Sequence, residues 1–256
     1  MKSTLSKAVC AALFLLPTIA AAAEVKGAKK QTLIDVYKEG GWVMHVLLLC
    51  SVAMVWLIID VALRTTRKKM TPPADVATAR QAFLAGDYVA AYQAMKAGTS
   101  PFCEVVRGAL GSVGHGKDAT EEAIYVTVEK INSTLQTRIN YLSVIGVCAP
   151  MIGLLGTVGG MKGAFGALGT SGADVGGLAA HIGEVLVATA TGLLVAIPAF
   201  GAFYFLRNKL QGAVHNLQDE SERLFRNAPY EYLQNADVGQ EETFAALPNW
   251  IESPEG

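Results

Sequence analysis

The chain has 256 residues, of which 52% are hydrophobic and 17% charged, and its formal net charge at pH 7 is -1. This composition is typical of a membrane protein with modest soluble parts, and it argues against a nucleic-acid partner, which would require a basic surface. The 4 cysteines do not suggest a disulfide framework, and we interpret Cys50, Cys103 and Cys148 as small buried hydrophobic residues.

Residues 1–23 have the features of a secretory signal peptide. Lys2 and Lys7 are basic, a short apolar run follows, and four alanines at residues 20–23 precede Glu24. A basic start, an apolar centre and a cleavage site of small residues define such a signal. The apolar run is short for a membrane span, although an uncleaved N-terminal anchor is the alternative. Residues 24–41 would then form a periplasmic N-terminal segment.

Three apolar segments are long enough to cross a membrane as helices, and they comprise residues 42–63, 139–165 and 178–206. The first would reach ~33 Å, compared with ~30 Å for the hydrocarbon core of a bilayer. Asp60 lies one turn before Arg64, which predicts an ion pair at the membrane border. The Gly-rich residues 166–177 predict a tight exterior turn, so the second and third spans would form an antiparallel hairpin.

Basic residues gather at one end of each span, and they are Arg64, Arg67, Lys68, Lys69, Arg138, Arg207 and Lys209. By the positive-inside rule these ends face the cytoplasm. The N-terminus and the turn at residues 166–177 would therefore be periplasmic. Residues 64–138 and 207–256, including the C-terminus, would be cytoplasmic.

The predicted cytoplasmic parts read as helices. Short helices are expected over residues 75–84, over residues 88–95 and from Ser100 to Gly111. Apolar residues then recur at helical spacing from Ile124 into the second span, which predicts one long helix projecting from the membrane. The third span continues likewise to Asn227, and an acidic mobile tail follows. The predicted fold is an all-α integral membrane protein with three transmembrane helices whose long helices extend into a cytoplasmic helical domain.

Several polar side chains interrupt the second and third spans. Thr157 and Thr189 would lie at nearly the same depth, and Glu184 slightly further out. On a straight helix Glu184 shares a face with Thr191, whereas Thr189 points away from it. Buried carboxylates and hydroxyls in membranes usually face a pathway or a partner, so a polar channel lining is favoured. Hydroxyls that bond only to their own helix, and a glutamate that caps the interface, are the simpler alternatives.

Small residues and prolines surround these polar groups. Gly153, Gly156 and Gly160 would allow close helix approach, while Pro150 and Pro198 can bend helices and free carbonyl groups. We find no motif of a hydrolase, metalloprotease or phosphate-binding loop, and therefore expect no enzyme activity and no cofactor. His181 and Glu184 alone would make only a weak metal site.

Two motifs resemble a known family. The segments APMIGLLGTVGGMKGAF at residues 149–165 and GEVLVATATGLLVAIPA at residues 183–199 resemble the second and third spans of MotA/TolQ/ExbB proton-channel proteins. Gly40-Gly41-Trp42 before the first span is similar too. The sequence departs from the family at Gly159, where many members have tryptophan, and at Lys162, where an apolar residue is usual.

The resemblance implies a homo-oligomer in the bacterial inner membrane, a pentamer around single-span partner helices of the ExbD/TolR type. An aspartate of the partner would carry the proton, and residues matching Thr157, Glu184 and Thr189 are associated with the proton path. A TonB-like protein would pass the motion to outer-membrane receptors. An ExbB-like role is favoured, and a TolQ-like envelope-integrity motor, a non-conducting scaffold and a small-solute transporter remain alternatives.

The alanine run predicts cleavage of the precursor before Glu24, because signal peptidases require small residues there. N-terminal sequencing of the protein from purified membranes should therefore start at or close to Glu24. A mature protein that retains Met1 would show that the segment is an anchor.

Overall fold

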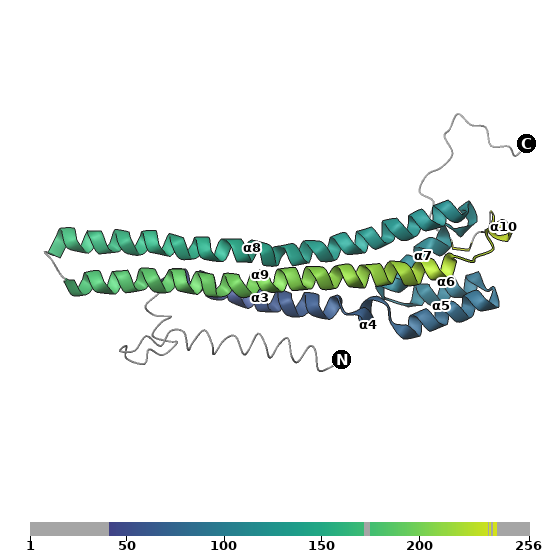
Figure 1. Cartoon of the computed structure of the whole chain (residues 1–256), viewed down its shortest axis with the longest axis horizontal. Coiled ribbons are helices and arrows are strands. Elements are labelled where there is room, and N and C mark those ends of the chain that lie inside the picture. The colour runs from purple at the N-terminus through teal and green to yellow at the C-terminus, as the bar shows by residue number, and fades with distance from the viewer. Residues whose placement is uncertain (1–40, 172–174, 235, 237, 240–256) are drawn as a thin grey trace, which may run out of the picture. The chain divides into compact units, whose positions relative to one another are not determined.

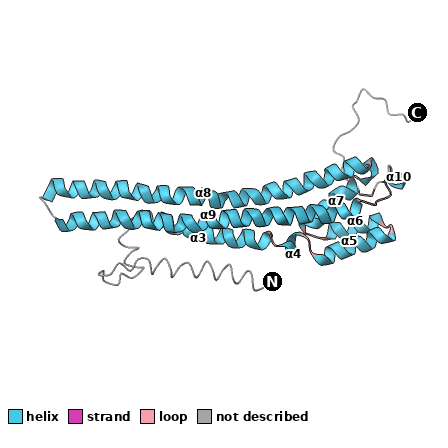
Figure 2. Cartoon of the chain, in the orientation of Figure 1, coloured by secondary structure: helices cyan, strands magenta, loops and turns pink. Residues whose placement is uncertain are grey.

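The computed structural model describes residues 41–171, 175–234, 236, 238 and 239, with the side chains of these residues except at 167–171, 175–180 and 184. Regular structure in these ranges is helical throughout, and no strand occurs in them (Figure 2). The predicted all-α fold class is confirmed. The expected signal peptide at residues 1–23 and the final residues 240–256 lie outside the described part.

Three helices are long and apolar enough to cross a membrane. They are α3 (Val43–Arg64), α8 (Lys117–Ser171) and α9 (Val175–Phe225). α8 and α9 continue through Pro150 and Pro198, and each extends well beyond a membrane span, as predicted. In the most apolar 18-residue stretch of each helix, only 22% is buried within the chain for α3, 22% for α8 and 28% for α9. The remaining apolar surface therefore requires lipid or other protein chains around it.

The predicted Gly-rich turn is largely helical. α8 continues to Ser171 and α9 begins at Val175, so residues 166–171 belong to a helix rather than to a turn. Helix propagation adds one hydrogen bond for each residue that it fixes, and this gain offsets the weak helix propensity of the glycines. Residues 172–174 lie outside the described part of the chain.

The chain divides into two compact units that share α8 and α9. The membrane unit consists of Met1–Asp60 and Arg138–Leu206, and the polar unit consists of Val61–Thr137 and Arg207–Gly256. In the membrane unit α8 and α9 run antiparallel beside α3 (Figure 1). Val43, Leu47 and Met54 form the buried face of α3 in this unit, at 3%, 1% and 7% exposure.

α8 and α9 meet at a line of small residues, which we call the glycine contact. A Cβ atom at Gly153 would lie 2.9 Å from the Ala188 carbonyl oxygen, and one at Gly156 would lie 3.0 Å from Ala188 Cβ. On the other helix, a Cβ atom at Gly192 would lie 2.7 Å from the Ala149 carbonyl oxygen. The backbones are therefore too close for side chains at these glycines.

The polar unit adds short helices, which were predicted from the sequence, and they pack beside the portions of α8 and α9 that belong to this unit. They are α4 (Arg67–Met70), α5 (Pro73–Ala85), α6 (Tyr88–Ala97) and α7 (Pro101–Gly111), followed by a 3-10 turn, η1 (Val113–His115). In Figure 1 the helices α5, α6 and α7 gather near the start of α8 and the end of α9.

Local signals explain where these short helices begin and end. Pro73 opens α5, and Gly86 ends it at φ 70°, a left-handed conformation that glycine adopts without strain. Asp87 and Ser100 cap α6 and α7 by accepting hydrogen bonds from the backbone amides of Ala90 and Cys103. The sequence-predicted helices therefore form with bounds close to those expected.

Aromatic packing and polar contacts attach α9 to the short helices. The Phe225 ring is 2% exposed and meets the Phe83 ring edge to face, with 5.0 Å between their centres. Arg80 donates to Glu220 at 2.8 Å. Lys209 donates to the Ala62 carbonyl oxygen at 3.0 Å, and burial lowers the pKa of its amine.

The first part of the predicted tail is docked. Tyr230–Leu233 form helix α10, and the Tyr230 hydroxyl donates to the Phe225 carbonyl oxygen at 3.0 Å. Val238 is 9% exposed, and Gly239 lies against the Tyr92 ring. The prediction of a mobile tail is therefore wrong for the described residues after Tyr230, because apolar groups between the acidic residues reach the surface of the polar unit.

The cysteines differ from one another in burial. Cys103 is 1% exposed, and burial raises the pKa of its thiol, which fits the predicted small hydrophobic role. Cys50 is partly exposed, and Cys148 is exposed on the single chain. The prediction of burial is therefore wrong for Cys148, which occupies an outward position of α8.

The substitution Gly192→Ala should destabilise the hairpin by about 1–3 kcal/mol, because its methyl group would force α9 away from the Ala149 carbonyl oxygen. Gly201→Ala provides the matched control, since a Cβ atom there meets nothing within 4 Å. Thermal unfolding in detergent should show a lower midpoint for Gly192→Ala alone. Equal midpoints for both variants would contradict the glycine contact.

Candidate functional site

The polar groups of the membrane unit begin with three threonines, whose hydroxyls bond locally. Thr157 donates to the Leu154 carbonyl oxygen at 2.6 Å, Thr189 to Val185 at 3.2 Å and Thr191 to Val187 at 2.8 Å. Each hydroxyl thereby satisfies its proton within its own helix and keeps lone pairs free to accept a hydrogen bond. All three residues are partly exposed on the single chain.

The glycine contact brings Thr157 and Thr189 to similar depth. Gly156 meets Ala188, and each threonine follows one of these two residues in the sequence. Because the helices are antiparallel, the two steps run in opposite directions, and the threonines are offset by only ~3 Å along the axis. A Cβ atom at Gly153 would also lie 3.2 Å from Thr189 Cα.

The same geometry places Thr157 and Thr189 on one flank of the hairpin, which we call the hydroxyl flank. When two right-handed helices run antiparallel, the residue that follows the contact residue in one helix points to the same side of the pair as the residue that follows the contact residue in the other. Thr191 precedes Gly192 by one residue and is therefore turned toward the opposite flank. The sequence had already turned Thr189 away from Thr191, but it could not place Thr157 on the side of Thr189.

α3 packs on the flank opposite to the hydroxyl flank. The Val43 side chain lies 3.3 Å from the Cβ position of Gly156. Among the glycines of α8 at the glycine contact, Gly156 points furthest away from the direction of Thr157. Val43 itself is 3% exposed. The hydroxyl flank is therefore the side of the hairpin that α3 leaves uncovered within the membrane unit.

Glu184 belongs to α9, four residues before Ala188 at the glycine contact. Its backbone therefore lies ~6 Å further toward the start of α9 than that contact. The Glu184 side chain is outside the described part of the structure. The assignment of Glu184 to an ion pathway therefore remains a prediction.

An ion pair that was not anticipated lies at the other end of the membrane unit. Arg138 on α8 donates through Nη1 to Oδ2 of Asp60 on α3 at 3.0 Å, and the two side chains are 40% and 18% exposed. The sequence had suggested only the neighbour Arg64 for Asp60. Asp60 lies near the end of the first predicted span and Arg138 directly precedes the second, and this shared depth is the signal from which the pair could have been predicted.

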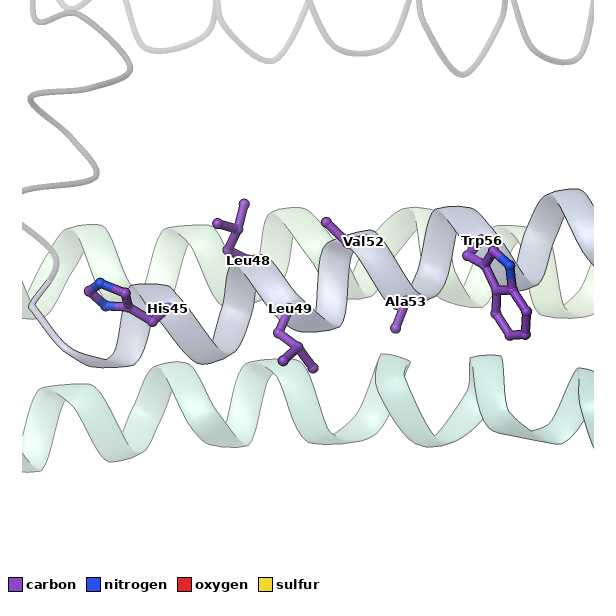
Figure 3. A pocket seen from close by; sticks show the side chains of 6 residues that line it. All are labelled: His45, Leu48, Leu49, Val52, Ala53 and Trp56. Atoms are coloured by element: carbon purple, nitrogen blue, oxygen red, sulfur yellow. The ribbon is translucent and has the colours of Figure 1, made fainter.

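An open apolar hollow lies along the exposed side of α3. It is lined by His45, Leu48, Leu49, Val52, Ala53 and Trp56 (Figure 3). Leu49 and Trp56 are 70% and 64% exposed. Its lining is almost wholly apolar, so this face suits contact with acyl chains or another apolar helix, and it offers no polar constellation for chemistry.

Among the described side chains, no three histidine, cysteine or acidic residues come together in a group that could hold a metal ion. Together, the three long apolar helices and the apolar surface that they leave exposed define a multi-pass membrane protein.

The comparisons with known proteins identify the family. Residues 92–219 match the MotA/TolQ/ExbB proton channel family, so the chain belongs to that family. The chain is also similar to the biopolymer transport protein ExbB of two strains of Xanthomonas campestris pv. campestris. In each case the identity is 29% over 204 residues, which cover 70% of this chain and 80% of the relative.

Replacement of each threonine by valine should leave the fold intact, because the hydroxyls bond only to carbonyls of their own helix. Thr157→Val, Thr189→Val and Thr191→Val should each change the free energy of unfolding by no more than about 0.5 kcal/mol. Unfolding in detergent, followed by circular dichroism, measures this. A loss of several kcal/mol would show that the hydroxyls hold the fold together.

Proposed function

We propose that the protein is an ExbB-like subunit of a proton-driven motor in the bacterial inner membrane, and that it conducts protons together with a single-span partner of the ExbD/TolR type. Family membership supports proton conduction as the class of function. The similarity to biopolymer transport proteins named ExbB supports the ExbB-like role. A TonB-like protein would receive the resulting motion and energise transport across the outer membrane.

The hydroxyl flank is the observation that carries this proposal to particular residues. Thr157 and Thr189 lie at similar depth on one side of the hairpin, and their hydroxyl oxygens can still accept hydrogen bonds. α3 occupies the other side. A partner helix placed against the hydroxyl flank would bring its own acidic side chain beside these oxygens.

In this proposal the two threonines position water or the partner's carboxyl group by accepting hydrogen bonds, and Glu184 relays or balances charge near the outer margin. A carboxylate in this setting is tolerable only where water or a partner solvates it. Thr191 is assigned a lesser part, because it is turned toward the flank on which α3 packs. Glu184 shares the face of Thr191, but it lies ~6 Å beyond the level of Val43, the first residue of α3.

The basic residues at the inner ends of the helices support an orientation with the C-terminus in the cytoplasm and the N-terminus in the periplasm. The proposed assembly is a homo-oligomer, a pentamer by analogy with the family, with the partner helices at its centre. Each chain leaves most of the apolar surface of its three membrane-crossing helices exposed, and this surface fits such an assembly.

Substitution at the hydroxyl flank should separate conduction from assembly. Thr157→Val, Thr189→Val and Glu184→Ala should each lower proton flux by at least about tenfold. A tenfold decrease corresponds to a barrier to proton transfer that is ~1.4 kcal/mol higher. Thr191→Val is the matched control and should retain most of the flux. Flux is measured in vesicles with a pH-sensitive dye, with and without a co-expressed single-span partner that carries an aspartate in its membrane helix.

Full flux and full energised uptake by the Thr157, Thr189 and Glu184 variants would refute these roles. A wild-type protein that supports uptake but carries no proton flux with its partner would instead favour a membrane scaffold. Rescue of envelope integrity rather than of uptake would indicate a TolQ-like role.

A further inference from the structure

A histidine lies in the contact between α8 and α9, toward the end of α8 and the start of α9. A Cβ atom at Gly160 would lie 2.5 Å from Val185 Cγ2 and 3.5 Å from the His181 carbonyl oxygen. One turn further along α8, a Cβ atom at Gly163 would lie 3.3 Å from Cε1 of the His181 ring, 3.5 Å from Nδ1 and 3.8 Å from Nε2. The imidazole therefore packs against the α8 backbone, in space that the missing side chain of Gly163 leaves open.

The packing against α8 leaves part of His181 accessible. His181 is partly exposed on the single chain, and Gly163 beside it is exposed. The residue is therefore held by the backbone of the other helix and still reaches the surface of the hairpin. An imidazole in this setting keeps a defined position and can exchange a proton with water or with a neighbouring group, which a ring sealed in a core cannot do.

Two charged residues lie near this level of the hairpin. Lys162 directly precedes Gly163 on α8 and is exposed, and Glu184 follows His181 by three residues on α9. With Gly163 and His181 taken as level, Lys162 lies ~1.5 Å and Glu184 ~4.5 Å further toward the middle of the hairpin, so only ~3 Å of depth separates them. Each precedes a contact residue, Gly163 in one helix and Val185 in the other. Both positions therefore lie on the flank opposite to the hydroxyl flank.

No further charged residue of the described chain lies at this level. α3 begins at Val43, whose contact with Gly156 is ~10 Å along the hairpin from the His181 ring. The described residues of α8 after Lys162 and of α9 before His181 include no charged residue. Asp174, between the two helices, lies outside the described part of the structure. Within the described residues, His181 thus has one cationic and one acidic residue near its level.

His181, Glu184 and Thr189 follow one another along α9 from its start toward the depth of the hydroxyls. Glu184 lies ~4.5 Å beyond His181, and Thr189 lies ~7.5 Å beyond Glu184. Residues three apart on a helix are neighbours, so a proton can pass between the first two directly or through one water molecule. Histidine is the side chain that ordinarily gains and loses a proton between pH 5 and 8. The imidazole is therefore the group of this series best suited to take a proton from water.

We propose that His181 is the proton-accepting residue at the outer entrance of the proton path. The imidazole takes a proton from the water of the periplasm. The resulting imidazolium gives this proton to the Glu184 carboxylate, which leaves a neutral imidazole and a carboxylic acid, and the proton continues from there to the acidic group of the partner. Gly163 provides the space that positions the ring. This inference rests on the proposed function, because it adds a residue to that path.

The substitution His181→Gln tests this role, because glutamine keeps a polar side chain but does not take up a proton. Proton flux is measured in proteoliposomes with the co-expressed single-span partner, at outside pH values from about 5 to 8 and at a constant pH difference across the membrane. His181→Gln should lower the flux by at least about tenfold and remove most of its dependence on outside pH. His45→Gln, in the apolar hollow along α3 (Figure 3), is the matched control and should keep both.

Chemical rescue separates a proton-accepting role from a packing role. In His181→Ala the space beside Gly163 is empty, and imidazole added to the outer solution should enter it and restore the flux severalfold. Pyrazole, a ring of similar size that stays uncharged at these pH values, should not restore it. Wild-type protein in the same imidazole concentration shows how much flux comes from leakage. Thermal unfolding in detergent checks the fold of each variant, and should His181→Gln fail to fold, His181→Asn provides the same comparison.

Flux of wild-type size with a wild-type pH profile in His181→Gln would overturn the proposal, and so would a loss of flux in folded His181→Ala that imidazole fails to restore. These results differ from failure of the proposed function. A wild-type protein that carries no proton flux with its partner would refute the proposed motor, whereas wild-type flux that does not depend on His181 refutes only this entrance.

Discussion

The glycines between α8 and α9 allow the backbones of the two helices to touch, and the arrangement of the membrane unit depends on this contact. Within lipid, apolar side chains gain little by leaving acyl chains for one another, so helices associate through close packing instead. A Cβ atom at Gly153, Gly156 or Gly192 would fall within about 3 Å of the opposite helix. The contact therefore fixes both the register and the rotation of the hairpin.

Register and rotation together decide where the polar groups lie. With Gly156 against Ala188, Thr157 and Thr189 share a depth and a flank, while Thr191 is turned to the side where Val43 of α3 packs. A rotation of either helix by one residue would move these hydroxyls to different sides. The site is thus a consequence of small residues that themselves carry no chemistry, and the proposed ion path depends on them indirectly.

Much of the fold could be predicted from the sequence, because helical periodicity and apolar length are local properties. The continuity of α8 from Ile124 into the second span, and the starts of α5 to α7, follow from such signals. Contacts between distant segments were less accessible. The pairing of Asp60 with Arg138 and the docking of Val238 depend on how elements fold back in space. The helical state of residues 166–171 was missed because glycine content was read as a turn.

The candidate site could be predicted only in part, for the same reason. Sequence spacing gave the depth of Thr157 and Thr189, but a straight-helix projection of α9 alone could not show which side faces α8 and which faces α3. Resemblance to MotA/TolQ/ExbB proteins identified the relevant spans, and the family match agrees with it. The sequence separated Thr191 from Thr189, but the placement of Thr157 and Thr189 on one flank, with α3 on the other, needed the packed hairpin.

Cysteine accessibility tests most directly whether the hydroxyl flank faces a hydrated, partner-occupied space. In a chain whose native cysteines are replaced by serine, Thr157→Cys and Thr189→Cys should react with a membrane-impermeant thiol reagent, and co-expression of the single-span partner should slow both reactions strongly. Leu155→Cys, at an exposed position of α8 that is turned away from Thr157, is the control and should react slowly in either case. Reaction of the threonine positions at the rate of that control, with no effect of the partner, would contradict the account.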